Sequence, residues 1–462
     1  MRRTTAALTL LFGLAQPLVA QDPVSVTVDQ AYAMAINAVQ AGDSKQAIKL
    51  LNGLIRARPD DPNLHLLQAT AYAQLNRPRP ARAAAARAYR LTDNPSQKVT
   101  AAEFAASSAL VQNRPTMTQL WLRRAAQHAD DKSQEQIAKD YAHVRRINPF
   151  SFTLRGGITP SDNVNSGTDT TDHIINDLRF GDIVSADGEA LSGIVTTMDA
   201  HLSYRLNQTQ TSLTTIGVRL YTRRVSLSSS AKAQLDADAA AVRRRNSDFA
   251  TDWAEVSLDH LIGLGEKSGN IGLGLSFGSF WYGGSGLFDY SQMRVKRGVP
   301  LNDRTFISFF GKVEARESAS SNNNDQMRYA IGSTLRRKLE NDARFSIGLT
   351  LEEADGDSPN VQSSSATIHG SYTFGKQLGP AEVSTSFSLT YTDHPLYSYG
   401  SDLIPPGRTD WSGSAGISFF FKDYDYAGFA PKLNIKAGKV SSTSTIFEAE
   451  ELSISFEIQS KF

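Results

Sequence analysis

The C-terminal segment LSISFEIQSKF, Leu452–Phe462, decides the fold of this chain. Apolar and polar residues alternate along it, with Leu452, Ile454, Phe456 and Ile458 separated by Ser453, Ser455, Glu457 and Gln459. Successive side chains of a strand point to opposite faces, so one set can contact lipid while the other faces a lumen. The segment therefore predicts a strand of a transmembrane β-barrel.

The same alternation recurs upstream, where the composition shifts after Phe150 to Ser, Thr, Gly, Phe and Tyr. It is clear at Phe345, Ile347, Leu349 and Leu351, and again at Val383, Thr385, Phe387, Leu389 and Tyr391. A soluble β-sandwich would also alternate, but runs of about 10 to 15 residues are too long for most sandwich strands. After the N-terminus there is no stretch of about 18 apolar residues, so any membrane span must be β.

The runs predict about 14 strands, an even number as a closed bacterial barrel requires. They start near residues 151, 196, 211, 248, 269, 287, 304, 325, 343, 363, 381, 409, 429 and 451. Short links near 207–210, 264–267, 338–342 and 376–379 alternate with long ones near 159–193, 226–246, 317–324, 353–362 and 394–408. Short turns of such barrels face the periplasm and long loops face outward. With an even number of strands, the first strand therefore begins and the last strand ends on the periplasmic side.

Upstream of the barrel, residues 29–146 are rich in helix formers with apolar positions three and four apart. Several positions recur 34 residues apart, the tetratricopeptide length: Ala35 with Ala69, Ala38 with Tyr72, and Ala47 with Ala81. Small residues allow antiparallel helices to cross closely, and Pro59 ends the second helix because proline lacks a donor N–H. We expect two tetratricopeptide-like repeats, a degenerate third helix pair over 97–112 and 116–128, and a groove that binds peptide or a partner helix.

Arg2 and Arg3, an apolar stretch and Ala20 predict a secretory signal peptide. The predicted domains are thus 1–20 signal peptide, 21–148 periplasmic helical domain and 149–462 outer-membrane barrel. The helical domain has 17 Lys and Arg against 11 Asp and Glu, and the barrel has 29 against 36. This basic surplus suits either ordinary solvated surface or an anionic partner. The chain has no cysteine, which excludes disulfides, thiolate metal sites and cysteine nucleophiles.

No catalytic cluster stands out, so we predict a protein that is not an enzyme, has no cofactor or metal and binds no nucleic acid. Four histidines were candidate bases: His201, His260, His369 and His394. The two that fall in strands, His201 and His260, fit simple lumen lining better. Gly272, Gly274 and Gly278 have no Walker lysine or following helix, so they fit bends within a strand. Residues 243–245, three arginines in a long outer loop, suit solvated loop charge or lipopolysaccharide phosphates.

A signal peptide, tetratricopeptide-like helices and a barrel that opens with PFSFTLRGGITPSDNVNSGT, residues 149–168, resemble the surface lipoprotein assembly modulator family, Slam. The specific piece is PSDNVN, made of Pro160, Ser161, Asp162, Asn163, Val164 and Asn165. It is similar to a P-x-S-N-V-N block of that family, with Asp162 between the serine and the first asparagine. Residues 428–462 are similar to the family's last two strands.

The resemblance implies an outer-membrane translocon that exports surface lipoproteins or secreted haem-binding proteins. Its partners would be the client protein, outer-membrane lipid and lipopolysaccharide, and periplasmic chaperones. Phe462 resembles the terminal aromatic that the barrel assembly machinery reads in porin-like proteins. Two alternatives remain open: an exopolysaccharide export pore on a tetratricopeptide scaffold, and an outer-membrane hydrolase.

Overall fold

The computed structural model describes residues 26–319, 324–400, 404–424 and 429–460. The predicted signal peptide and Phe462 lie outside the described residues, and the domain limits 21–148 and 149–462 stay predictions. The chain divides after Trp121 into two compact units, which are described separately. None of the helices in the described ranges is long and apolar enough to cross a membrane.

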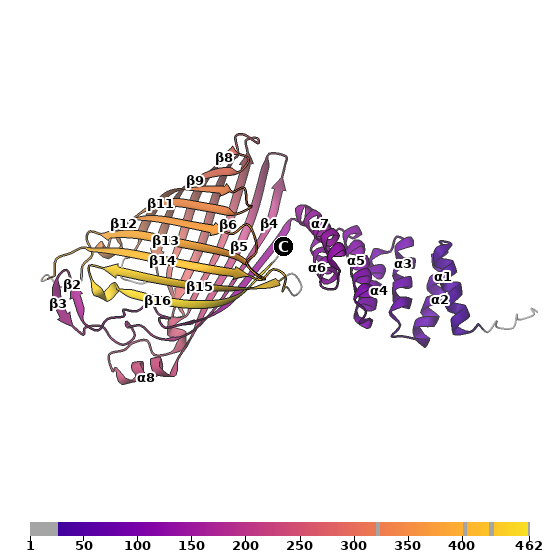
Figure 1. The fold of residues 1–462 in the computed structure, drawn as a ribbon, viewed down its shortest axis with the longest axis horizontal. Helices are drawn as coiled ribbons and strands as arrows, with labels where there is room; N and C mark the ends of the chain where they lie inside the picture. The colour runs from indigo at the N-terminus through magenta and orange to yellow at the C-terminus, as the bar shows by residue number, and fades with distance from the viewer. Residues whose placement is uncertain (1–25, 320–323, 401–403, 425–428, 461–462) are drawn as a thin grey trace, which may run out of the picture. The chain divides into compact units, whose positions relative to one another are not determined.

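From residue 26 onward, seven helices precede the first strand (Figure 1). They are α1 Val28–Gln40, α2 Ser44–Ala57, α3 Pro62–Gln74, α4 Pro78–Leu91, α5 Pro95–Val111, α6 Pro115–Ala126 and α7 Asp131–Ile147. Side chains that accept backbone N–H groups cap five of them: Thr27, Asp43, Asp61, Asn94 and Asp130. Proline at the first helical position begins α3, α4, α5 and α6.

The helix pairs repeat as the 34-residue period predicts. Ala35, Ala47, Ala69 and Ala81 are fully buried, Tyr72 is half-buried, and Pro59 follows the end of α2. Residues with positive φ come just after α1, α3 and α5: Gly42, Asn76 and Asn113. Such residues allow the chain to leave a helix through the left-handed region. The predicted third pair is α5 with α6, and α7 is a further helix.

The second unit contains a closed antiparallel barrel of 14 strands. Its strands are β1 Phe150–Ser161, β4 Gly193–Gln208, β5 Ser212–Leu227, β6 Thr251–Gly263, β7 Asn270–Tyr282, β8 Ser285–Asn302, β9 Thr305–Ser318, β10 Gln326–Lys338, β11 Arg344–Gly356, β12 Ser363–Thr373, β13 Glu382–His394, β14 Arg408–Phe420, β15 Phe429–Ser442 and β16 Ala449–Ser460. Each predicted strand is present. The barrel closes where β1 pairs with β16, with Gly156 opposite Ile458.

Two long connections contain structure that the alternation pattern did not predict. The β1–β4 connection holds the short hairpin β2 His173–Ile175 and β3 Leu178–Gly181, and the β5–β6 connection holds helix α8 Ser229–Ala237. Figure 1 shows both at the same end of the barrel. We call this the long-loop end and the opposite one the short-turn end. The chain passes from α7 into β1 at the short-turn end.

Candidate functional site

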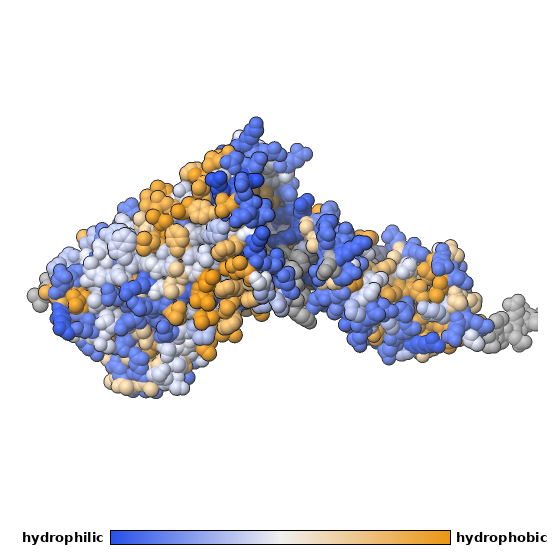
Figure 2. Space-filling view, viewed as in Figure 1, coloured by the Kyte–Doolittle hydropathy of each residue, from blue (hydrophilic) through white to orange (hydrophobic). Residues whose placement is uncertain are grey.

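The outer face of the barrel is apolar. Cross-strand pairing places many large, solvent-exposed apolar residues on this one face, including Phe152, Ile158, Met198, Leu220, Val256, Leu275, Phe277, Met293, Phe309, Ile331, Leu351, Ile368, Leu389, Leu452, Phe456 and Ile458. Figure 2 shows apolar side chains gathered in a band across the strands. A patch of this extent fits lipid and not water, so the barrel is a transmembrane one.

The lumen face is polar, and between β4 and β8 it holds one linked set of side chains. The Arg219 guanidinium donates two hydrogen bonds to Asp199, of 2.9 and 2.8 Å. It also lies 4.6 Å from the centroid of the Trp253 ring. The indole N–H of Trp253 donates to the Tyr290 hydroxyl over 2.8 Å, and this hydroxyl donates to Glu255 over 2.7 Å. Four strands, β4, β5, β6 and β8, are thereby joined through lumen side chains.

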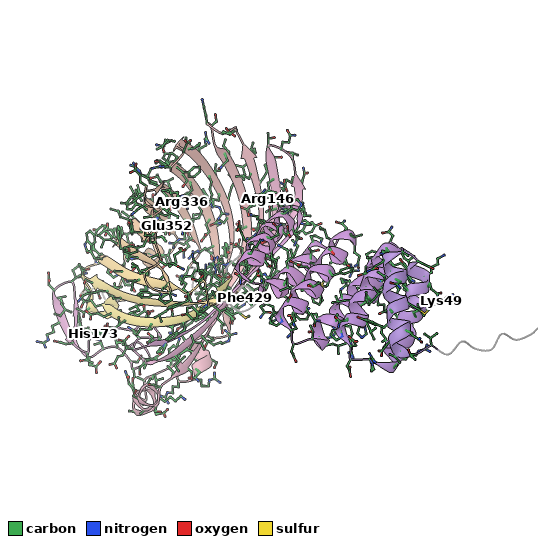
Figure 3. The ribbon with its side chains drawn as sticks, turned by 45° about the vertical axis from the view of Figure 1, so that its right-hand side comes forward. Lys49, Arg146, His173, Arg336, Glu352 and Phe429 are labelled. Carbon is green, nitrogen blue, oxygen red and sulfur yellow. The ribbon has the colours of Figure 1, made fainter. Side chains whose placement is uncertain are left out.

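A second set of charged lumen side chains links β9, β10 and β11. Glu314, which is buried, accepts a 2.6 Å hydrogen bond from Arg316 and lies 3.6 Å from the ammonium of Lys312. Lys312 also lies 3.5 Å from Glu352, which pairs with Arg328. Figure 3 shows Glu352 within the barrel. Buried carboxylates need such partners because an unpaired buried charge is costly.

The lumen wall from β12 to β14 is different, because hydroxyl side chains occupy almost all of its positions. These are Ser363, Ser365, Thr367, Ser371 and Thr373 on β12, Ser384, Ser386, Ser388, Thr390 and Thr392 on β13, and Ser412, Ser414 and Ser418 on β14. The lumen thus has one charged side, whose charges largely pair with one another, and one neutral polar side. A polar lining of this kind is typical of the interior of transmembrane barrels.

The PSDNVN segment begins a cap over the long-loop end, made of residues 162–192, 228–250 and 443–448. Pro160 and Ser161 end β1, and Asp162 is exposed. The Asn163 side chain is buried and makes two 2.8 Å hydrogen bonds with the backbone of Gly167. A Cβ on Gly167 would lie 2.2 Å from the carbonyl oxygen of Glu189, so only glycine fits this close approach.

Asn165 holds the two halves of the first cap segment together. Its amide donates to the carbonyl oxygens of Asp187 and Glu189 over 3.1 and 2.6 Å and accepts from the Leu191 N–H over 2.9 Å. Val164, between the two asparagines, is 1% exposed. The PSDNVN segment therefore has a structural role, because its two asparagines and its valine hold the backbone of the cap in place.

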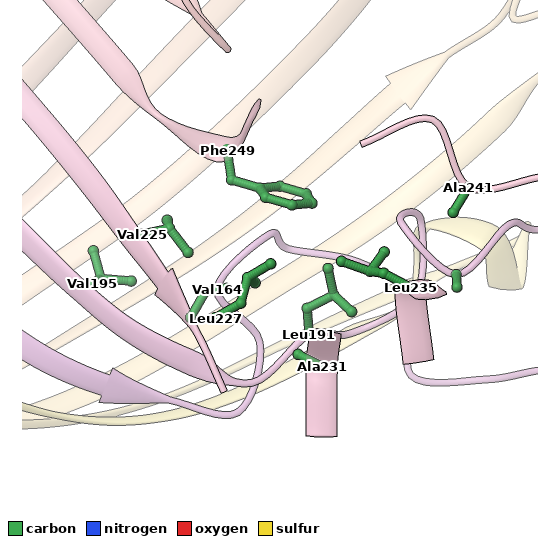
Figure 4. Close-up of a cluster of buried hydrophobic side chains, with 10 residues drawn as sticks. Val164, Leu191, Val195, Val225, Leu227, Ala231, Leu235, Ala241 and Phe249 are labelled. Atoms are coloured by element: carbon green, nitrogen blue, oxygen red, sulfur yellow. The ribbon is translucent and has the colours of Figure 1, made fainter. Parts of the chain in front are cut away.

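Val164 belongs to a hydrophobic cluster that joins cap segments 162–192 and 228–250 to the barrel wall (Figure 4). The cluster contains Val164, Ala186, Leu191, Val195, Val225, Leu227, Ala231, Leu235, Ala241 and Phe249. Phe249, just before β6, is fully buried, and Figure 4 shows its ring among these side chains. Burial of apolar area, which favours the closed arrangement, is the main force available to hold loops together.

Cap segment 162–192 also contacts the β13–β14 and β15–β16 connections. The Thr168 hydroxyl donates to the carbonyl oxygen of Thr445, Ile175 forms an antiparallel bridge with Ser444, and Asn176 donates to the carbonyl oxygens of Pro405 and Gly407. These contacts join residues more than 200 positions apart, so the cap spans from β1 to the β13–β14 and β15–β16 connections.

His394 lies at this mouth in a cluster with Arg408 and Asp410. The Arg408 guanidinium lies 2.8 Å from His394 Nε2 and 3.1 Å from Asp410 Oδ2. It also lies 4.5 Å from the ring centroid of Tyr397 and 3.7 Å from that of Phe447. These two aromatic residues belong to the β13–β14 and β15–β16 connections, so the cluster ties loops together.

The other candidates from the sequence do not meet in one place. His201 faces the lumen opposite Arg219, and His369 faces it beside Gly348. The prediction that His260 lines the lumen is wrong. His260 shares the outer face with Val256, and its Nδ1 lies 2.9 Å from the Thr214 hydroxyl. Among the described residues, no three His, Asp or Glu side chains form a potential metal site.

The three β7 glycines and the arginines at 243–245 have structural roles. Gly272, Gly274 and Gly278 lie in β7 and face the lumen without a break in pairing. They leave room for neighbours, since a Cβ on Gly278 would lie 2.6 Å from the Tyr290 ring. Residues 243–245 lie in the cap, where Arg243 stacks on Tyr282, Arg244 donates to backbone carbonyls and Arg245 pairs with Asp248. All three arginines are nevertheless exposed, which agrees with the expectation of solvated loop charge.

Sequence reasoning missed the lumen ion pairs, although the signal was present. In the run KVEAR, residues 312–316, charged residues alternate with the apolar residues Val313 and Ala315. Alternating charges of opposite sign at lumen positions predict pairs across and along strands.

The helical unit presents a second candidate surface. Helices α2 and α4 together carry seven Lys and Arg and no Asp or Glu. Their buried residues are apolar except for one serine, and six of the seven cations are exposed, whereas Arg82 is half-buried. Helix α3 packs against both of these helices and against α1 and α5.

No protein-family model matches the chain, and the curated proteins give no match. Three solved structures show limited similarity. The Yersinia enterocolitica type III secretion chaperone SycD, in complex with a peptide of the translocator YopD, is 15% identical, covers 28% of this chain and 98% of its own, and has a TM-score of 0.25. A bacterial polysaccharide outer membrane secretin is 9% identical, covers 67% and 98%, and has a TM-score of 0.34. Pseudomonas aeruginosa OccK2 (OpdF), in complex with glucuronate, is 10% identical, covers 68% and 98%, and has a TM-score of 0.35.

Proposed function

We propose that this chain is an outer-membrane translocon that exports client proteins, surface lipoproteins or secreted haem-binding proteins, to the cell surface. The observation that carries the proposal is a lipid-facing closed barrel of 14 strands with a polar lumen, preceded in the same chain by an array of helix pairs. Helix pairs of this kind form surfaces that bind extended peptide or a partner helix. The helical unit would capture the client, and the barrel would pass it.

The proposed orientation places the helices in the periplasm and the cap outside the cell. An even number of strands puts the start of β1 and the end of β16 at the short-turn end, as in bacterial barrels with periplasmic turns. Chaperone hand-over inside, or folding of the client outside, would bias the direction. Phe462 would serve the barrel assembly machinery, and outer-membrane lipid and lipopolysaccharide would surround the barrel.

An exopolysaccharide pore is the second candidate, and the hydroxyl-lined wall of β12 to β14 favours it because hydroxyl groups also suit sugars. The two proposals differ in cargo, so one experiment separates them. Surface proteins and surface polysaccharide would be compared between cells with the gene, cells without it and complemented cells. Selective loss of one or a few surface proteins supports protein export. Loss of polysaccharide with unchanged surface proteins rejects it.

The cap has to open during export, and the absence of native cysteine allows a direct test. Ile175 and Ser444 form an antiparallel bridge, so cysteines at both positions lie within reach of a disulfide. We expect Ile175→Cys/Ser444→Cys to stop export when oxidised and to recover it after mild reduction. Ile175→Cys alone should export normally under both conditions. Full export by the oxidised double variant, with the disulfide verified by mass spectrometry, would contradict an opening cap.

A further inference from the structure

The short-turn end of the lumen contains a cavity of about 1100 Å³ next to the β6–β7, β8–β9 and β10–β11 turns. Its lining holds six basic residues, Lys267, Arg304, Arg336, Arg337, Lys338 and Arg344, and two acidic ones, Glu266 and Asp303. Elsewhere on the charged side of the lumen most cations have a carboxylate partner, so this sector differs in its charge balance.

Cross-strand pairing shows which of these charges face the lumen. Arg336 lies between Phe306 and Ser346 on the lumen face, and Lys338 lies opposite Arg344. Lys296, on β8, faces the lumen beside Phe310. Figure 3 shows Arg336 inside the barrel near this end. Arg336, Lys338 and Arg344 therefore face the lumen at the cavity, and Lys296 lies farther along the same wall, outside the cavity lining.

Nearby carboxylates neutralise this sector only in part. Arg304 pairs with Glu340 over 3.5 Å, Lys338 with Asp342 over 2.7 Å and Arg344 with Glu382 over 2.9 Å, and the cations of all three pairs are well exposed to solvent. Exposed pairs of this kind are weak and can exchange partners. Among the described residues, neither Lys296 nor Arg336 has an ion-pair partner. Charges of one sign in a cavity with low-dielectric walls concentrate the field and attract anions.

We propose that this cavity binds acidic segments of polypeptide, through their carboxylates, as they enter the barrel. The inference rests on the proposed export function and names the chemistry of the segment that enters first. The guanidinium of Arg336 can donate two parallel hydrogen bonds to a carboxylate. Pro300, Leu301, Phe306 and Phe345 add apolar lining. This mixture suits a polypeptide, whose acidic residues lie among apolar ones, better than an acidic polysaccharide.

The test uses purified full-length protein in detergent and a fluorescent ten-residue peptide of alternating Glu and Leu. Anisotropy measures its affinity for wild-type protein, for Arg336→Gln and for Lys376→Gln. Lys376 is the matched control because it is an exposed cation in the β12–β13 turn of the same end, outside the cavity lining. We expect Arg336→Gln to weaken binding about three- to tenfold and Lys376→Gln less than about twofold. Wild-type binding should also weaken as salt rises.

Three results would overturn the proposal: no binding of the acidic peptide to wild-type protein, equal weakening by the two variants, or binding of a uronic acid oligomer in place of the peptide. A Lys-Leu peptide of the same length should not bind. Because this assay needs no client, it is independent of the cell-surface comparison. If the peptide binds but the surface proteins of cells without the gene are unchanged, the site is supported and export is rejected. If surface proteins are lost from cells without the gene but the peptide does not bind, export is supported and the site is rejected.

Discussion

Replacement of Phe249 by alanine tests whether the hydrophobic cluster holds the cap closed. The ring is fully buried, and burial of about 150 Å² at about 25 cal/mol per Å² contributes about 4 kcal/mol. Part of this remains with the alanine methyl, so we expect Phe249→Ala to destabilise the closed cap by about 3 kcal/mol, within the usual range for such truncations. This change raises the population of open cap by roughly a hundredfold.

Hydrogen exchange followed by mass spectrometry measures this population, because amides of α8 exchange when the cap opens. The matched control is Val242→Ala, since Val242 lies in the same connection but is 84% exposed. We expect α8 peptides to exchange about a hundredfold faster in Phe249→Ala and at the wild-type rate in Val242→Ala. If the two variants protect α8 equally well, the cluster does not hold the cap and the reasoning is refuted.

Three further predictions concern the cap and the wall. Asn165→Ala removes three hydrogen bonds to the cap backbone and leaves their partners unsatisfied, so α8 should exchange at least tenfold faster. Gly278→Ala places a methyl 2.6 Å from a tyrosine ring, whereas Gly311→Ala meets nothing within 4 Å. Only the first should destabilise the barrel, by about 1–3 kcal/mol, and thereby lower its heat-unfolding midpoint on gels. Partial burial opposes ionisation of Asp187, but hydrogen bonds from the Ser185 hydroxyl and from backbone N–H groups outweigh it and hold the pKa of Asp187 below its ordinary value. The stability that this carboxylate gives to the cap is therefore complete above about pH 4 and is lost as the pH falls through the depressed pKa. Hydrogen exchange of the cap amides, corrected for intrinsic exchange rates, should be constant from neutral pH to about pH 5 and should become faster below about pH 4.

Strand and helix positions follow from the sequence because both signals are local. Alternation from Leu452 to Ile458 assigns each side chain to lipid or lumen, and the structure confirms this for β16. The 34-residue recurrence likewise predicts the buried alanines Ala35 and Ala69. His260 shows the limit of this reasoning: its polarity favoured the lumen, but the parity of its strand places it outside.

The cap lay beyond sequence reasoning, even though PSDNVN was the segment singled out. Its short motif indicates a family resemblance but not which distant residues Asn165 and Val164 contact. Those contacts, such as Thr168 with Thr445, depend on closure of β1 against β16, which brings the two ends of the barrel sequence together.

The sequence by itself determined that a helical array precedes a transmembrane barrel of 14 strands, because side-chain periodicity is a property of a few consecutive residues. Only the tertiary structure decided that the long loops fold into a cap, that lumen charges pair along one side, and that Arg336, Lys338 and Arg344 gather at the short-turn end. Charge balance in a lumen depends on which strands become neighbours and in what register, and no local pattern contains that information.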